Sequence, residues 1–158
     1  MKIYKKIFIF ICILFSFLYG LYVWYNSSYL IKETPIPNDI KEKILELNEI
    51  NFSELVDGEW DTLIIIPPYS DSKYIKKHFN ININRLENST IKYGDGQSLF
   101  IFCKKDKIES YFYIRYPLAD IDYTSLNNVY KIPRNEAIFT YVKGETIPKL
   151  IKIEKSSN

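Results

Sequence analysis

The stretch LFIFCKKDKIESYFYIRY, residues 99–116, decides the fold of this chain. Leu99 to Cys103 is a short apolar run, Lys104 to Lys107 is charged, and Ile108 to Tyr116 is a second run rich in aromatic and β-branched residues. Two such runs joined by a short polar segment are typical of a β-hairpin. Pro117 ends the second run, because proline cannot donate a hydrogen bond to a neighbouring strand.

Upstream of this hairpin, Trp60 to Ile66 contains four consecutive apolar residues between Asp57-Gly58 and Pro67-Pro68. A short apolar run bounded by turn signals is typical of a strand covered on both faces. We then expect a helix from about Lys73 to Phe79, capped by Ser70, Asp71 or Ser72. Downstream, Ile138 to Val142 and Lys149 to Ile153 predict a second hairpin around residues 143–145.

A further helix is predicted from Asn38 or Asp39, as its cap, to about Glu49. Ile40, Ile44 and Leu47 recur at helical spacing, and charged residues fill the other face. These elements together predict an α+β domain. We expect a mostly antiparallel sheet of about five strands, with both helices on one face.

Residues 58–142 show a wider pattern: Trp60-Asp61, an apolar strand, Pro68-Tyr69, a short capped helix and then the hairpin. This pattern resembles that of small uncharacterised bacterial membrane-anchored proteins and lipoproteins, although Pro67 stands where glycine is common. The resemblance implies a domain type and no activity. Physically, we expect Trp60 to cover the core edge, Asp61 to accept hydrogen bonds from nearby amides, and Pro68-Tyr69 to fix the strand-to-helix turn.

The N-terminal segment predicts a membrane anchor, residues 1–25. Residues 7–25 carry no charge and are long enough to cross a hydrocarbon core of about 30 Å. Lys2, Lys5 and Lys6 precede this run, and aromatic residues gather at its far end. This distribution predicts a single-pass protein of the cell membrane, with its N-terminus cytoplasmic and its C-terminal domain outside. A cleaved signal peptide is the competing interpretation, although the run is long for one.

After the anchor we expect a polar tether at residues 26–37 and one extracytoplasmic domain at residues 38–155. The chain has 21 basic and 19 acidic residues, but three of the lysines lie in the first six residues. The part outside the membrane is therefore close to neutral, which argues against a nucleic-acid partner. Cys12 falls in the anchor and Cys103 in a predicted strand, so we expect no disulfide within the chain.

Two pairs of carboxylates are the candidates for acid–base or metal chemistry. Glu59 and Asp61 flank Trp60, and Asp120 and Asp122 lie in an irregular segment. Alternate residues of a strand point to the same side, so each pair could converge. Solvation of a strand entry or a loop explains both pairs more simply. The single histidine, His78, with Cys103 falls short of a zinc ligand set, so we expect no metal and no cofactor.

The second arm of the hairpin offers a different kind of site. Tyr111, Tyr113 and Arg115 fall on one face of the predicted strand. Tyrosine and arginine dominate the contacts of protein-binding surfaces. A covered sheet face with the same residues is the simpler structural explanation.

The leading functional hypothesis is a non-enzymatic, membrane-tethered interaction module. Its partners would be the membrane, through residues 7–25, and an envelope or secreted protein, with Tyr111, Tyr113 and Arg115 as contacts. One alternative is a small metal-dependent or carboxylate-dependent hydrolase that uses Glu59, Asp61 or the Asp120–Asp122 pair. Another alternative is a structural subunit of a membrane complex.

Overall fold

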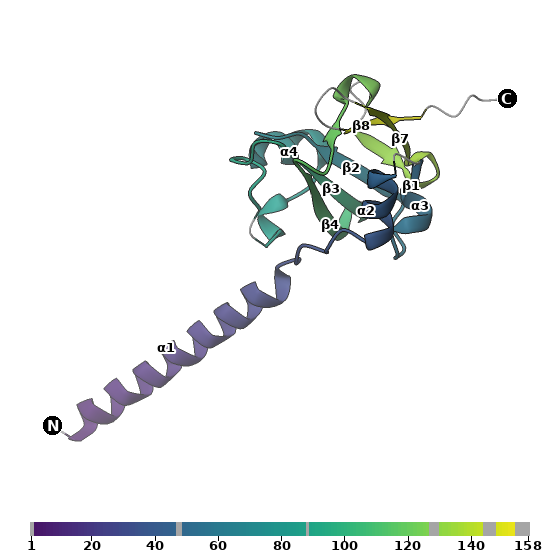
Figure 1. Cartoon of the computed structure of the whole chain (residues 1–158). Coiled ribbons are helices and arrows are strands. Elements are labelled where there is room, and N and C mark those ends of the chain that lie inside the picture. The colour runs from purple at the N-terminus through teal and green to yellow at the C-terminus, as the bar shows by residue number, and fades with distance from the viewer. Residues whose placement is uncertain (1, 47–48, 88, 127–129, 144–147, 154–158) are drawn as a thin grey trace. The chain divides into compact units, whose positions relative to one another are not determined.

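The computed structural model describes residues 2–46, 49–87, 89–126, 130–143 and 148–153 (Figure 1). The chain divides into two compact units, residues 1–30 and residues 31–158. The first unit is the helix α1, Lys2–Tyr29, in which the window Ile7–Trp24 has a mean hydropathy of 2.4 and side chains that are exposed throughout. By length and composition, this one N-terminal helix can cross a membrane.

The second unit is an α+β domain dominated by antiparallel strands, as the sequence predicts. Its central sheet has the order β4-β3-β2-β6, and every pair in it is antiparallel. The strands are β2 (Thr62–Ile66), β3 (Gln97–Lys104), β4 (Lys107–Arg115) and β6 (Lys131–Pro133).

The predicted hairpin of residues 99–116 is the β3–β4 pair. Its two-residue turn consists of Lys105 and Asp106, whose φ angles are +48° and +63°. Two consecutive positive φ angles make a type I′ turn, whose twist matches that of the flanking strands. Lys104 and Lys107 pair directly across it, so the charged segment is the turn that the sequence predicts.

A second sheet has the order β1-β7-β8-β5. β7 and β8 form the predicted second hairpin, while residues 144–147 between them lie outside the described residues. β5 pairs with β8 in parallel and is the exception to the antiparallel pattern. The strands are β1 (Ile50–Asn51), β5 (Asp120–Ile121), β7 (Ile138–Lys143) and β8 (Pro148–Lys152).

The strands thus form two sheets, where the sequence predicts one sheet of about five. β1, β5 and β6 have only two or three residues each, too few to show a hydrophobic period. The helices of the domain are α2 (Asn38–Leu45), α3 (Phe52–Leu55) and α4 (Ser72–Phe79). Short 3₁₀ turns add η1 (Ile83–Arg85), η2 (Tyr123–Leu126) and η3 (Arg134–Glu136).

The two predicted helices form, with small differences at their ends. α2 starts directly after Pro37, without a side-chain cap, and residues 47–48 at its expected end are outside the described residues. In α4, the carboxylate of Asp71 accepts hydrogen bonds from the amides of Lys73 and Tyr74, both at 2.8 Å. Asp71 is therefore the cap among the three predicted candidates.

The central sheet is buried on both faces, as the apolar run Leu63–Ile66 predicts. One face packs on the second sheet and on α2, with Phe52, Phe100 and Phe112 at its centre. The other face packs on α4 and on Ile81, Ile83, Leu86 and Ile91. The helices therefore lie on opposite faces, and the expectation of both on one face is corrected. A run apolar on both sides needs a cover for each side.

The structure describes the surroundings of Trp60, Asp61 and Tyr69. Trp60 is buried in the core, and its indole N–H donates to the carbonyl of Val56 at 3.0 Å. Asp61 accepts hydrogen bonds from the hydroxyl of Thr62 and the amide of Lys105. Tyr69 occupies the turn between β2 and α4 with a φ of +62°.

Part of the expected tether belongs to the domain. Ile31 bridges Leu86 through backbone hydrogen bonds of 2.8 Å to residues 85 and 87, and the amide of Thr34 donates to the carbonyl of Tyr111 at 2.8 Å. We call residues 31–34 the strap. These contacts fix the strap along residues 85–87 and β4, where the sequence predicts a polar linker.

Candidate functional site

Two of the three predicted contact residues lie inside the domain. The exposed fractions of Tyr111 and Tyr113 are 0% and 1%. The hydroxyl of Tyr111 donates to the carbonyl of Glu87 at 2.8 Å, and the amide of Thr90 donates to the hydroxyl of Tyr113 at 3.3 Å. The proposed surface is therefore corrected: both rings are core, and their hydroxyls bond to Glu87 and Thr90, which explains tyrosine rather than phenylalanine.

Arg115, the third predicted contact residue, is exposed but already has partners. Its guanidinium donates to both carboxylate oxygens of Glu33, at 2.7 and 3.0 Å, and lies 4.6 Å from the ring centroid of Tyr113. Arg115 thereby connects Glu33 of the strap to the Tyr113 ring in β4.

The same end of the central sheet carries a different group of tyrosines, which are exposed. Tyr69, Tyr93 and Tyr116 have exposed fractions of 61%, 77% and 62%. Tyr93 is part of the loop of residues 91–96, which precedes β3, and Tyr69 and Tyr116 form hydrogen bonds with this loop. We call these three residues the tyrosine surface.

Backbone hydrogen bonds hold the tyrosine surface together. The amide of Tyr69 donates to the carbonyl of Ile91 at 2.9 Å, and the amide of Tyr93 donates to the carbonyl of Thr90 at 2.9 Å. The amide of Tyr116 donates to the carbonyl of Gly96 at 2.7 Å. The backbone at all three tyrosines is thus fixed in or beside one loop, which lowers the backbone entropy lost when a partner binds.

Two features of the loop position these side chains. Gly96 has a φ of +62°, a conformation that glycine adopts without steric cost. Loss of solvation and a hydrogen bond to the Asp95 carboxylate raise the pKa of the Tyr69 phenol. The phenol therefore stays protonated as a hydrogen-bond donor.

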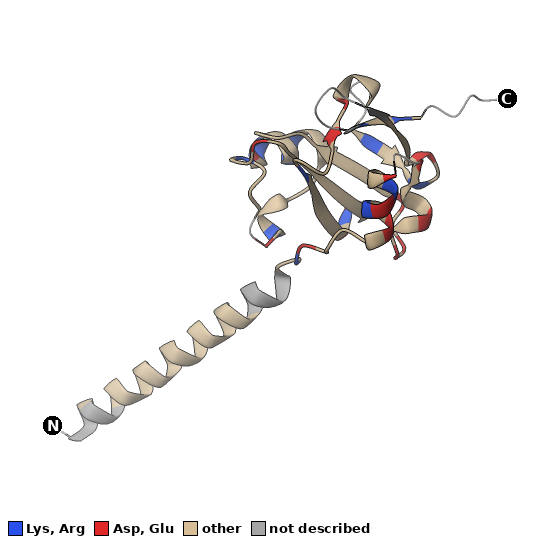
Figure 2. Cartoon of the chain, viewed as in Figure 1, with Lys and Arg blue, Asp and Glu red and all other residues tan. Residues whose placement is uncertain are grey.

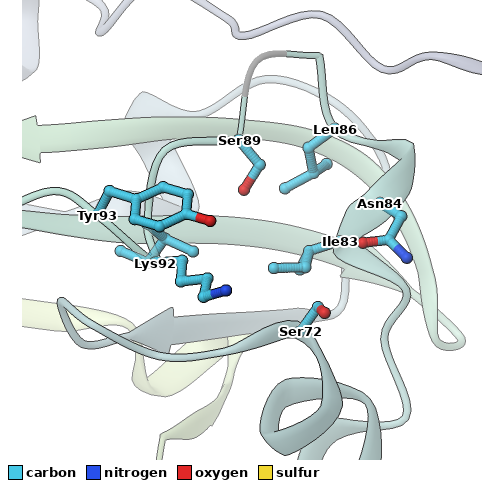
Figure 3. A pocket seen from close by; sticks show the side chains of 8 residues that line it. Ser72, Ile83, Asn84, Leu86, Ser89, Lys92 and Tyr93 are labelled. Atoms are coloured by element: carbon cyan, nitrogen blue, oxygen red, sulfur yellow. The ribbon is translucent and has the colours of Figure 1, made fainter.

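Residues of this loop line two cavities. The smaller, of about 230 Å³, involves Tyr116. Its lining residues are Pro68, Asp95, Gly96, Tyr116, Ala119, Asp120 and Tyr123. The larger, of about 300 Å³, involves Tyr93 and is called the Lys92 pocket (Figure 3). Its lining residues are Ser72, Ile83, Asn84, Leu86, Ser89, Ile91, Lys92 and Tyr93.

Charge is distributed unevenly over the two faces of the domain (Figure 2). Residues 71–93, on the α4 side, carry five Lys or Arg residues against Asp71 and Glu87. Residues 39–61, which include α2 and α3, carry eight Asp or Glu residues against Lys41 and Lys43. The Lys92 pocket therefore lies on the basic side.

The first predicted carboxylate pair is occupied by structural contacts. Glu59 forms an ion pair with Lys104. A hydrogen bond from Lys104 lowers the pKa of Glu59, and a hydrogen bond from Thr62 lowers the pKa of Asp61. General acids need raised pKa values, so both shifts run opposite to that requirement.

The second predicted pair is also engaged locally. Asp120 accepts a hydrogen bond from the amide of Ile121 at 2.8 Å. Asp122 accepts hydrogen bonds from the hydroxyl and amide of Thr124, and the first of these lowers the pKa of Asp122. Each carboxylate thus accepts hydrogen bonds from residues that closely follow it in the chain.

Cys103 and His78 are the remaining candidates for chemistry, and in the described part of the chain neither belongs to a group of metal-binding side chains. Burial raises the pKa of the Cys103 thiol to about 12, so the thiol stays protonated at neutral pH. The Nδ1 atom of His78 lies 2.9 Å from the carbonyl of Tyr74, one turn earlier in α4. Across the described ranges, no group of three His, Cys, Asp or Glu side chains could hold a metal ion.

Sequence reasoning missed Tyr93 and Tyr116 as exposed residues and gave Tyr69 only a structural role. Tyr93 stands in the turn Tyr93-Gly94-Asp95-Gly96, and Tyr116 directly precedes Pro117. Aromatic residues beside turn residues are the signal that could have identified them, since turns lie on the surface.

Comparisons of the chain with protein-family models, with curated proteins and with solved structures find no match.

Proposed function

We propose that this protein is a membrane-tethered module that binds another protein outside the cytoplasm, without catalysing a reaction. In this proposal α1 is a retained anchor with its N-terminus in the cytoplasm. The lysines before the apolar run and the aromatic residues at its end support this orientation. The partner is an envelope or secreted protein.

The observation that carries the proposal is the tyrosine surface. Exposed tyrosines supply large contact areas with few rotatable bonds, and they are enriched in the most energetic contacts of protein interfaces. Here Tyr93 lies in the loop of residues 91–96, and backbone hydrogen bonds join the exposed Tyr69 and Tyr116 to the same loop. Tyr111 and Tyr113, the buried contact residues predicted from sequence, bond to Glu87 and Thr90 before this loop and do not themselves reach a partner.

The membrane anchor favours a binding role for a simple physical reason. A tether raises the effective concentration of the domain near partners in or at the same membrane. A modest interface then suffices for capture.

The test is chemical crosslinking of the full-length protein in its native membranes, followed by affinity purification and mass spectrometry. We compare the wild type with Tyr69→Asn, Tyr93→Ser and Tyr116→Ser. Asparagine is chosen at position 69 because it tolerates a positive φ. The matched control is Leu45→Ser, which removes an exposed apolar side chain from α2, on the opposite face of the central sheet.

The proposal expects one partner in stoichiometric amounts with the wild type and with Leu45→Ser. The three tyrosine variants should lose it while they melt at the wild-type temperature. Equal capture by all five proteins would overturn the tyrosine surface as the contact, and absence of any captured protein would overturn the binding role.

A further inference from the structure

We propose that the Lys92 pocket binds a small organic anion, in which a carboxylate or phosphate is joined to an apolar body. This site borders the tyrosine surface, with which it shares Tyr93, but its ligand is a small molecule and not a protein. It rests on the shape, lining and charge of the pocket.

The pocket has an apolar floor and a polar rim. Ile83, Leu86 and Ile91 are buried, with exposed fractions of 4%, 4% and 0%. A volume of about 300 Å³ is at the lower end of the range of small-molecule sites. An apolar floor with few polar groups at the mouth is the usual composition of such sites.

The rim offers hydrogen-bond donors from separate segments. In Figure 3, Tyr93 and Lys92 lie on one side of the pocket and Asn84 on the other, while the hydroxyls of Ser89 and Ser72 lie above and below in this view. The Lys92 ammonium is also 5.1 Å from the ring centroid of Tyr93. Hydroxyl, amide and ammonium groups can all donate to the oxygens of a carboxylate or phosphate.

The charge of the lining selects the sign of the ligand. Lys92 is the one residue with a formal charge among the eight lining residues. The surrounding residues 71–93 are also basic in sum. A concave site with walls of one sign raises the local concentration of counter-ions.

Asp71 is the group that opposes an anion here. Its carboxylate caps α4, and hydrogen bonds from Tyr74 and Lys73 lower its pKa, so it is ionised at neutral pH. Lys92 makes the smallest contribution to the same lowering. Asp71 therefore offsets part of the attraction of Lys92 for an anion.

This competition gives the proposal a sharp test. Asparagine caps helices about as well as aspartate, so Asp71→Asn removes the opposing charge while it keeps the cap. Lys92→Met removes the attracting charge while it keeps an unbranched side chain. The matched control is Lys76→Met, an exposed lysine of α4 that does not line the pocket.

The experiment measures ¹⁹F transverse relaxation of 4-fluorobenzoate, 4-fluorophenyl phosphate and neutral 4-fluorobenzamide with the full-length protein in lipid nanodiscs. Empty nanodiscs give the background from partition into lipid. Probes of this size bind in about the millimolar range. Thermal melts check that each variant is folded.

We expect at least one anionic probe to bind the wild type and Lys76→Met equally. Its affinity should fall about tenfold in Lys92→Met, as expected for a lost charge-assisted hydrogen bond, and rise in Asp71→Asn. Binding of the neutral probe should be weaker. The proposal is overturned if neither anion binds, if the neutral probe binds equally well, or if Lys92→Met and Asp71→Asn leave the affinities unchanged.

Discussion

Arg115 and Glu33, 82 residues apart in the sequence, form a bidentate ion pair that connects β4 to the strap. The bridge between Ile31 and Leu86 continues this connection to the segment that lines the Lys92 pocket. The chain that leaves α1 is therefore part of the domain from residue 31 onward.

The first prediction concerns this ion pair. Arg115→Met should destabilise the domain by less than about 1 kcal/mol, because the two side chains lie at the surface, 47% and 36% exposed to solvent. It should nevertheless speed hydrogen exchange at the amides of Ile31 and Thr34, since the strap loses one of its ties. Lys104→Met, which removes another exposed ion pair, is the control and should leave these amides unchanged. Unchanged strap exchange in Arg115→Met would show that the backbone contacts alone hold the strap.

The second prediction separates a core role from a contact role for Tyr111. Tyr111→Phe should lower the free energy of unfolding by about 1 kcal/mol, the usual value of one hydrogen bond. Tyr111→Ala should lower it by about 3–5 kcal/mol, as for other large buried side chains. Urea unfolding measures both values. A Tyr111→Ala protein as stable as the wild type would contradict the burial of this ring.

The third prediction concerns alkaline pH. Burial raises the pKa of Tyr111, Tyr123 and Cys103 to about 12 in the folded protein, above their ordinary values of 10.0, 10.0 and 9.0. The folded state then holds these protons more tightly than the unfolded state. Stability should therefore fall as the pH rises from about 9 to 12.

Urea midpoints measured at pH 8 and pH 11 test this prediction, and the midpoint at pH 11 should be lower. Tyr123→Phe removes one of the titrating groups, so the difference between the two midpoints should shrink. Identical midpoints in the wild type at both pH values would contradict the raised pKa values.

The fourth prediction concerns the proposed topology. In a Cys12→Ser background, Glu109→Cys places a thiol at an exposed position of β4. A membrane-impermeant maleimide added to intact cells should label it, whereas Lys2→Cys should be labelled only after lysis. Buried Cys103 should stay unlabelled in both proteins. Labelling of Lys2→Cys in intact cells would reverse the orientation.

The sequence predicts the central elements of this fold because their signals are local. The hairpin of residues 99–116 has two apolar runs around a charged turn, and Asp71 stands where a helix cap is expected. The short strands β1 and β5 were missed because two residues carry no period. Their positions depend on pairing with β7 and β8, which lie far away in the sequence.

The candidate site was harder to predict for a related reason. Alternation along β4 places Tyr111 and Tyr113 on one face, but alternation does not say whether that face is covered. Ile81, Ile83, Leu86 and Ile91 cover it, and their spacing in the sequence does not predict that they pack on the sheet. Exposure of Tyr93 and Tyr116 depends on the same long-range packing.

The measurement that most directly tests the binding role is site-specific photocrosslinking in native membranes. Benzoylphenylalanine replaces Tyr69, Tyr93 or Tyr116 in turn, with Leu45 as the control position. We expect the same partner to be crosslinked from the tyrosine positions and not from position 45. Crosslinks of equal yield from position 45, or none from any tyrosine position, would contradict a protein-binding role for the tyrosine surface.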